Sequence, residues 1–195
     1  ISSENYLISM DMDNFENNMK INYLNISRNS QYQYNDNEII LDIKENNHFI
    51  YLLTNKGLYS AFIKDKNGNV LDKDIEFIKS KSNFPSSPSS IFIENNKIYL
   101  STPQGLWFSN SGIDGYFQKV NAFGNEVIFS VGGVGSSLFV FKSDGITSIH
   151  IYDYSENFLN FDLNKLNNNI VVNSVLAINK NIVAAVNDGV MLSKD

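Results

Sequence analysis

The chain repeats one ten-residue pattern four times, as IYLLTNKGLY at residues 50–59, IYLSTPQGLW at 98–107, LFVFKSDGIT at 138–147 and IVAAVNDGVM at 182–191. Each copy is an apolar run, two or three turn-forming residues, a glycine and a second apolar run. This order predicts a β-hairpin whose first strand is buried on both faces, because its apolar residues are nearly continuous rather than alternating. We expect the glycine to supply a positive φ angle at the turn, which a β-branched residue resists.

The spacing of the four glycines predicts how the hairpins assemble. Gly57, Gly105, Gly145 and Gly189 are 48, 40 and 44 residues apart. One four-stranded β-propeller blade has about this length. Helical repeats of similar period would show a 3.6-residue pattern, and a pair of β-sandwiches, the alternative all-β interpretation, would not repeat an ungapped hairpin. We therefore predict an all-β fold of about four four-stranded antiparallel blades, forming a single β-propeller segment over residues 1–195.

Turn signals and further apolar runs complete the predicted blades. A turn signal precedes each repeat, at residues 46–47, 95–96, 135–136 and 179–180. Additional strands are expected at 61–64 with 74–78 around the turn 67–69, at 116–120 with 126–131, and at 147–152. Residues 6–10 and 21–26 predict a hairpin of an incomplete earlier blade. Residues 80–90 predict a surface loop, and 155–169 predict a loop or a short helical turn. Since the last repeat stops soon after its second strand, we expect a larger ring, or a ring that another segment completes.

The composition agrees with short strands and many turns, and it excludes several kinds of function. Aromatic residues make up 13% of the chain, and 30 residues are Asn, which tolerates the backbone angles of turns. With no cysteine there is no disulfide, Cys-ligated zinc or thiol catalysis. No apolar run is long enough for a membrane-spanning helix. The net charge is −6 and Arg28 is the single arginine, so we do not expect sequence-specific nucleic-acid binding.

Residues that could carry chemistry are few and lack supporting neighbours. His48 and His150 have no potential metal ligand or acid–base partner at useful spacing, so we expect surface or packing roles. Asp11 and Asp13 share one face of a predicted strand and could hold Ca²⁺, but the glycine and distal Glu of an EF-hand loop are missing. Asp153 and Glu156 could form a carboxylate pair for sugar hydrolysis. A solvated loop is the simpler interpretation of that pair.

Three other features have a plain structural interpretation. The glycine-rich run at 131–137 lacks the Lys and the following helix of a phosphate-binding loop, so we expect a turn between blades. Trp107, the single tryptophan, aligns with Tyr59, Thr147 and Met191, which indicates a packing position between blades rather than an exposed sugar platform. The glycosylation triplet at 25–27 is expected by chance in an Asn-rich chain.

Two resemblances to known propellers follow from these residues. The hairpin at 98–109, with Thr-x-x-Gly followed by Leu-Trp-Phe-Ser, resembles those of sialidase-like and photosystem-assembly-type propellers. Residues 109–115 match the Asp-box motif of sialidases only in part. The arginine triad of sialidases cannot be formed with one arginine, so that activity is not expected.

Residues 95–193 resemble the tail nozzle proteins of short-tailed bacteriophages. The resemblance rests on Leu-Trp-Phe-Ser-Asn-Ser-Gly at 106–112, Tyr-Phe at 116–117, the hairpin at 138–146 and Asp-Gly-Val at 188–190; Ser111 stands where that family commonly has proline. It implies a structural virion protein in a ring around the tail channel. An acidic surface suits a channel through which DNA passes without being held.

We therefore expect a non-catalytic structural or interaction protein of a bacteriophage tail, located in the virion. Its partners would be other protein subunits, in a homo-oligomeric ring, with no membrane and no cofactor or metal. The alternative is a carbohydrate- or peptide-binding propeller that is extracellular or at the cell surface. A hydrolase whose active residues lie outside this chain is the third hypothesis.

Overall fold

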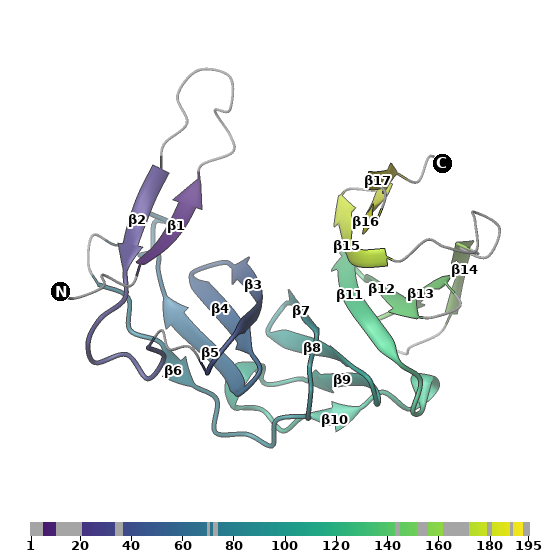
Figure 1. Cartoon of the computed structure of the whole chain (residues 1–195), viewed down its shortest axis with the longest axis horizontal. Coiled ribbons are helices and arrows are strands. Elements are labelled where there is room, and N and C mark those ends of the chain that lie inside the picture. The colour runs from purple at the N-terminus through teal and green to yellow at the C-terminus, as the bar shows by residue number, and fades with distance from the viewer. Residues whose placement is uncertain are drawn as a thin grey trace. The chain divides into compact units, whose positions relative to one another are not determined.

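The computed structural model contains antiparallel sheets separated by turns and loops (Figure 1). It describes residues 6–10, 21–33, 37–69, 71, 74–142, 145–151, 156–161, 172–178, 181–187 and 189–192. The chain divides into two compact units, residues 1–80 and 81–195, and each is described by itself. The predicted single segment over 1–195 stays a prediction.

The first unit contains a two-stranded and a four-stranded sheet. Strands β1 (Tyr6–Met10) and β2 (Ile21–Asn25) pair antiparallel, which confirms the predicted N-terminal hairpin. The four-stranded sheet has the order β3 (Ile40–Asn46), β4 (Phe49–Thr54), β5 (Gly57–Phe62) and β6 (Ile78–Lys79). Neighbours in sequence are therefore neighbours in the sheet, as in a propeller blade.

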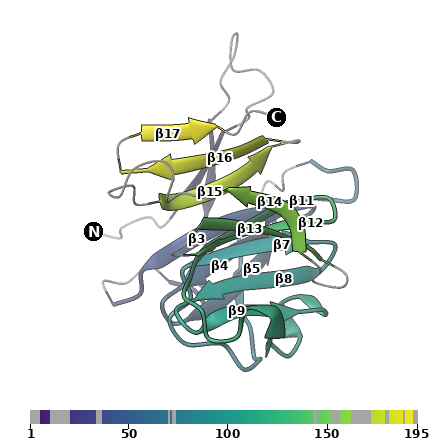
Figure 2. The same cartoon turned by 90° about the vertical axis from the view of Figure 1, so that its right-hand side faces the viewer.

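The second unit contains three sheets with the same meander order. The first is β7 (Ser90–Glu94), β8 (Lys97–Thr102), β9 (Gly105–Ser109) and β10 (Gln118–Lys119), with 3₁₀ turns at Gly112–Asp114 and Asn121–Phe123. The second is β11 (Ile128–Val134), β12 (Ser137–Lys142), β13 (Gly145–His150) and β14 (Glu156–Phe161). The third, seen face on in Figure 2, is β15 (Val172–Ile178), β16 (Asn181–Val186) and β17 (Gly189–Leu192). The predicted all-β class with four-stranded antiparallel blades is confirmed.

The four repeated hairpins are β4–β5, β8–β9, β12–β13 and β16–β17, as predicted. In each, the glycine opens the second strand and pairs with the last residue of the first strand. The glycine φ angles are +159°, +122°, +144° and +142° at Gly57, Gly105, Gly145 and Gly189. The predicted positive φ is thus confirmed, but it falls one residue after the turn rather than within it. Asp144 and Asp188, expected to form the turn with their glycines, lie outside the described residues.

Buried apolar residues continue through the first strand of each well-described hairpin. In β4 and β8 five consecutive residues are buried, and in β12 four are. Asparagine makes the turns before β4 and β8, with φ angles of +55°, +45° and +66° at Asn47, Asn95 and Asn96. Both observations confirm the sequence prediction, since Asn tolerates these angles better than most residues.

The core of the first unit lies on one face of β4 and β5. Its buried members are Tyr32, Ile50, Leu52, Tyr59, Ala61, Ile63, Ile75 and Phe77. The ring of Tyr32 stands edge-on to Tyr59 at 5.4 Å and to Phe77 at 5.9 Å. The segments around residues 26–33 and 75–77 are joined by the bridge between Ile26 and Ile75, and they supply several of these side chains.

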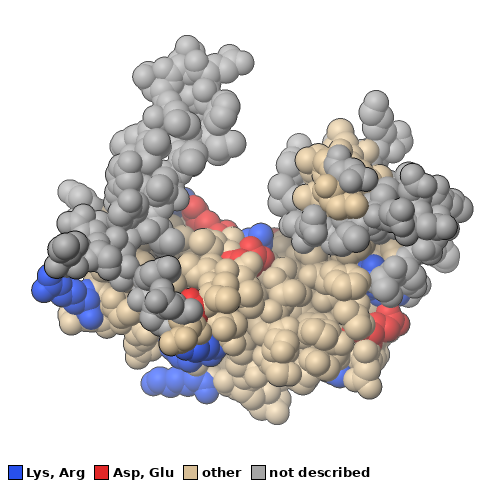
Figure 3. Space-filling view, in the orientation of Figure 1, with Lys and Arg blue, Asp and Glu red and all other residues tan. Residues whose placement is uncertain are grey.

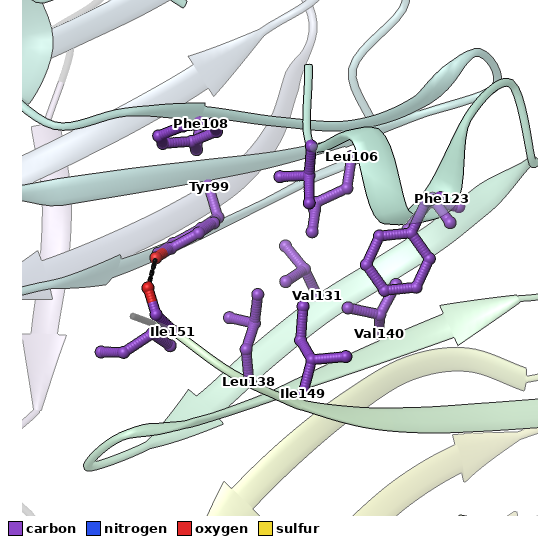
Figure 4. Packing of buried hydrophobic residues seen from close by; sticks show 11 residues of the cluster. Tyr99, Leu106, Phe108, Phe123, Val131, Leu138, Val140, Ile149 and Ile151 are labelled. Carbon is purple, nitrogen blue, oxygen red and sulfur yellow. Dashed lines mark hydrogen bonds between the residues drawn. The ribbon is translucent and has the colours of Figure 1, made fainter. Parts of the chain in front are cut away.

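The core of the second unit lies between two adjacent blades. Tyr99 and Leu106 of β8 and β9 face Val131, Leu138 and other residues of β11–β13 (Figure 4). The Tyr99 hydroxyl donates a hydrogen bond of 3.4 Å to the Ile151 carbonyl. A Cβ atom on Gly133 of β11 would lie 2.6 Å from Cζ of Phe92 in β7. The Ser137 carbonyl oxygen also lies 2.8 Å from this position, so a side chain here would collide with backbone as well as with Phe92.

Four expectations about the connecting segments are wrong. The pairing expected between 61–64 and 74–78 is instead made by Tyr59 and Ser60 of β5 with Lys79 and Ile78 of β6. Residues 116–120 and 126–131 do not pair with each other, since β10 joins the blade of β9 and β11 opens the next blade. The glycine-rich run is the end of β11 and the turn into β12, within one blade, rather than a turn between blades. Residues 156–161, expected in a loop, form β14. The loop at 80–89 is confirmed.

Candidate functional site

A lysine from the outermost strand covers the hairpin glycine in two blades. Atoms of Lys79 and Lys119 lie 2.6 and 3.5 Å from where a Cβ atom of Gly57 and Gly105 would be. The carbonyl oxygen of Gly124 also lies 2.6 Å from the Cβ position of Gly105. An alkyl chain can rest on a residue that lacks a side chain while the ammonium group stays in water.

The same lysines contact the aromatic residue two positions after the glycine. Lys79 is the cross-strand partner of Tyr59, and its Nζ atom lies 5.4 Å from the ring centroid. Lys119 is the partner of Trp107, with Nζ at 5.5 Å from the ring. Cation–π contacts of this kind contribute about 0.5–1 kcal/mol at exposed sites. We call this repeated arrangement of glycine, aromatic residue and lysine the lysine bracket.

A buried carboxylate also lies in the first unit, and sequence analysis missed it. Glu38 Oε1 accepts hydrogen bonds from the Thr54 hydroxyl at 2.7 Å and the Tyr59 hydroxyl at 2.9 Å. Burial raises the pKa of Tyr59 above its ordinary value, and the hydrogen bond and negative charge of Glu38 raise it further. Tyr59 therefore stays protonated as a donor. Because Glu38 lies 21 residues before Tyr59, no local pattern reveals the contact.

Serine hydroxyls join two blades of the second unit. Ser101 Oγ lies 2.8 Å from the hydroxyls of both Ser89 and Ser90. Ser90 Oγ accepts the Val131 amide at 2.9 Å, and Ser89 Oγ donates to the Phe129 carbonyl at 2.8 Å. These hydroxyls form hydrogen bonds with backbone groups of β11, so they hold the two sheets together.

The histidines named from the sequence are both half-buried. The ring of His48 lies 5.9 Å from the ring of Phe62, and its Nδ1 atom is buried without a hydrogen-bond partner among the described residues. His150 ends β13 opposite Ser137. His48 belongs to the first unit and His150 to the second.

The remaining candidates lie apart from one another or outside the described residues. Asp11, Asp13 and Asp153 are outside them, and Glu156 opens β14. Within the described part of the chain, no group of three His, Asp or Glu residues is placed to hold a metal ion. Among these same residues, no helix is long and apolar enough to cross a membrane.

Trp107 is half-buried rather than fully enclosed between blades. It is flanked in its sheet by Leu100 of β8 and Lys119 of β10. Its Nε1 atom is buried and has no hydrogen-bond partner in the described part of the chain. The predicted packing role is therefore only partly confirmed, because the Trp107 ring packs beneath Lys119 of the outermost strand β10.

Large apolar side chains are exposed in both units. In the first they are Ile39, Leu41, Ile43, Phe49, Phe62 and Ile78; in the second they are Tyr116, Val127, Phe129, Val190 and Leu192. On the face in Figure 3, acidic and basic residues are scattered between uncharged ones in the described part. On this face the described residues form no patch of one charge.

Comparison with known proteins supports the fold. No family model and no curated protein matches the chain. The extracellular domain of the one-component system BT4673 from B. thetaiotaomicron is a similar solved structure, with TM-score 0.61 and 13% identity over 98% of this chain and 27% of that one. BamB from Moraxella catarrhalis is similar with TM-score 0.52 and 14% identity over 77% of this chain and 42% of that one.

A computationally designed protein, Ika4, also matches, with TM-score 0.58 and 10% identity over 86% of this chain and 97% of that one. The natural neighbours are β-propellers, so the chain has a β-propeller-type fold. It spans less than half the length of either natural neighbour. At these identities the likeness concerns the fold alone.

Proposed function

We propose that this chain is a non-catalytic structural protein that works by binding other protein subunits through its blade surfaces. Its buried Glu38 is occupied by two structural hydrogen bonds, and the clustered serines bind backbone groups. These polar groups are therefore already used within the fold, and we take the exposed surfaces as the candidate functional features. The proposal rests chiefly on an apolar stripe on β3 and the residue that precedes it.

The stripe consists of Ile39, Leu41 and Ile43, with exposed fractions of 61%, 40% and 42%. They alternate with Ile40, which is partly buried against the core, and Asp42. In the described part of the chain, β3 pairs on one side only, with β4. Edge strands usually carry charge that prevents association with other chains. Three exposed branched side chains on an edge therefore favour an interface.

Charges beside the stripe are paired with each other. Lys44 Nζ lies 3.2 Å from Asp42 Oδ1, and Lys64 binds Glu45. Pairing within the chain leaves little net charge to repel a second apolar surface. The partner we infer is another copy of the chain, in the ring that the sequence resemblance implies.

The test is the mass of the full chain in solution, measured by light scattering after gel filtration. We expect a discrete oligomer for the unaltered chain. Ile39→Thr with Ile43→Thr keeps β-branched residues and should shift the mass toward the monomer, whereas Ile78→Thr on β6, 56% exposed, should not. A monomer throughout the micromolar range, or equal masses for all three proteins, contradicts the proposal.

The specific assembly that we propose is the tail of a short-tailed bacteriophage. It is supported by the sequence resemblance over residues 95–193, and the propeller-type fold is compatible with it. Labelling of purified virions with an antibody raised against this chain should mark the tail. Labelling of host cell surfaces with virions left unmarked would refute this assignment.

A second candidate, carbohydrate binding, is favoured by one observation. The rings of Phe49 and Phe62 lie 5.3 Å apart, edge to face, and are 40% and 42% exposed beside His48. Exposed aromatic rings can stack on the apolar faces of sugars. Glycan-array binding that is lost in Phe62→Ala and kept in Ile78→Thr would favour this candidate over the structural one.

A further inference from the structure

One register position carries a different residue in the first blade than in the other sheets. Asp42 of β3 lies opposite Leu53, the fourth residue of the first repeat. In the sheets of the other three repeats the residue opposite the fourth repeat residue is a serine, namely Ser90, Ser130 and Ser174. One of four equivalent positions thus has a carboxylate in place of a hydroxyl.

The amide that follows this position is bound in different ways in β3 and β11. Ile43 and Val131 have the same register, because each lies opposite the third residue of its repeat. The Val131 amide donates to the hydroxyl of Ser90 in the neighbouring sheet at 2.9 Å, so it points away from its own sheet. The Ile43 amide donates to Oδ1 of Asp42, in its own strand, at 2.8 Å. Asp42 therefore supplies within β3 the contact that a neighbouring sheet supplies to β11.

Two further features lie beside the Asp42 carboxylate at the edge of β3. Lys44 Nζ lies 3.2 Å from the oxygen that accepts the Ile43 amide. A bulge at Leu41 interrupts the ladder with β4 immediately before Asp42. Bulges and charged side chains are common means of protecting a sheet edge, and an amide that already has an acceptor is not free to bind an added strand. The edge of β3 thus has apolar side chains that can be bound and a backbone that is blocked at Ile43.

We propose that Asp42 prevents strand pairing between copies of the chain at β3, and so restricts their contact to the side chains of the apolar stripe. The occupant of the stripe is a second copy, and this part of the inference rests on the proposed function. Backbone pairing would accept almost any extended edge, because every residue offers the same hydrogen-bonding groups. Contact between side chains depends on their shapes. Asp42 therefore determines the specificity of the contact.

The test compares variants of the full chain at Asp42 with one at a second acidic residue of β3. Asp42→Ala removes the acceptor of the Ile43 amide. Asp42→Ser has a hydroxyl one bond closer to the backbone, too short to accept from the next amide in a straight line, and should fold because serine occupies this position in the other three sheets. Asp42→Asn keeps the oxygen acceptor without the charge. Glu45→Ala removes a charge from the same strand, where Glu45 binds Lys64.

Hydrogen exchange of the Ile43 amide at low protein concentration measures the contact with Asp42 directly. Loss of one hydrogen bond should speed this exchange by about two- to ten-fold in Asp42→Ala and Asp42→Ser, but not in Asp42→Asn or Glu45→Ala. At high concentration, light scattering should give a larger mass for the Ala and Ser variants at position 42 than for the unaltered chain. Paired β3 edges then add to whatever association the unaltered chain shows. Asp42→Asn and Glu45→Ala should have the mass of the unaltered chain.

Three results would overturn the role of Asp42. They are equal masses for the unaltered chain, Asp42→Ala and Asp42→Ser; Ile43 exchange that is unchanged in both variants; and a mass increase in Asp42→Asn or Glu45→Ala as large as in Asp42→Ala. In the last case charge, rather than the bound amide, would protect the edge. A monomeric unaltered chain contradicts the proposed function separately, because the effect of Asp42→Ala is measured against the unaltered chain in either case.

Discussion

Replacing Gly105 by alanine should destabilise the second unit more than a positive φ angle alone explains. Gly105 has a φ of +122°, and an added Cβ atom would lie 2.6 Å from the Gly124 carbonyl oxygen. The backbone conformation costs an L-residue about 1–3 kcal/mol. Since the obstacle is backbone rather than a flexible side chain, overpacking adds about 1–3 kcal/mol. The expected loss is therefore about 2–6 kcal/mol in the free energy of unfolding.

The matched control is Gly135→Ala, in the turn between β11 and β12. Gly135 has a φ of +56°, but no atom of the described residues lies within 4 Å of its Cβ position. Its substitution should cost only the conformational strain, about 1–2 kcal/mol. Urea unfolding followed by Trp107 fluorescence measures both losses, because the single tryptophan lies in β9 of the same unit. Equal losses for the two variants would refute the close approach between Gly105 and Gly124.

Three further outcomes follow from the contacts above. Lys119→Met keeps an alkyl chain over Trp107 and removes the charge, so urea unfolding should show a loss of about 0.5–1 kcal/mol; an unchanged midpoint contradicts the bracket. The pKa of Tyr59 is raised, so its contribution to stability is complete below the ordinary tyrosine pKa and is lost as pH rises through the folded-state pKa. Glu38→Gln should lower the Tyr59 pKa, which tyrosine ¹³C NMR measures. An identical Tyr59 titration in the variant would exclude the contact with Glu38. Hydrogen bonds from the side chain and amide of Asn69 lower the pKa of Asp65, so stability present above the ordinary aspartate pKa is lost as pH falls through the folded-state pKa. Asp65→Asn should flatten this acid dependence of the free energy of unfolding. An unchanged slope of the free energy of unfolding against pH would contradict the prediction.

The hairpins could be predicted from sequence because everything that forms them is local. The apolar run, the two turn residues and the glycine lie within ten residues, and the positive φ angles occur at the predicted glycines. The Asn turns are local in the same way. The pairing error at 116–120 with 126–131 has the opposite cause. Both runs have strand composition, but each pairs with its own blade, and the choice depends on contacts between sheets.

The lysine bracket and the Glu38 contact were not predictable in this way. Lys79 follows its glycine by 22 residues and Lys119 by 14, so no ungapped alignment places the two lysines together. Glu38 precedes the repeat and has no counterpart with the same contacts at Gly105. Such contacts depend on where a loop brings the chain back to the sheet. These loops can differ in length because lengthening a loop adds little to the entropy cost of closing it.

The unequal fourth strands indicate which part of a blade is specified by the repeat. The second and third strands of four sheets come from the repeated order of run, turn and glycine within this chain. By contrast, β6 and β10 pair over only two residues and β14 over a longer, irregular stretch. A short outer strand protects the edge from association with other chains while adding few hydrogen bonds of its own. Its main contribution in the first two blades is the lysine that covers glycine and aromatic ring. At Gly189 of β17 the glycine is kept, and Met191 stands where the first two blades have an aromatic residue. The repeat therefore specifies the hairpin and its glycine, whereas the lysine that covers them depends on the loop that brings the fourth strand back to the sheet.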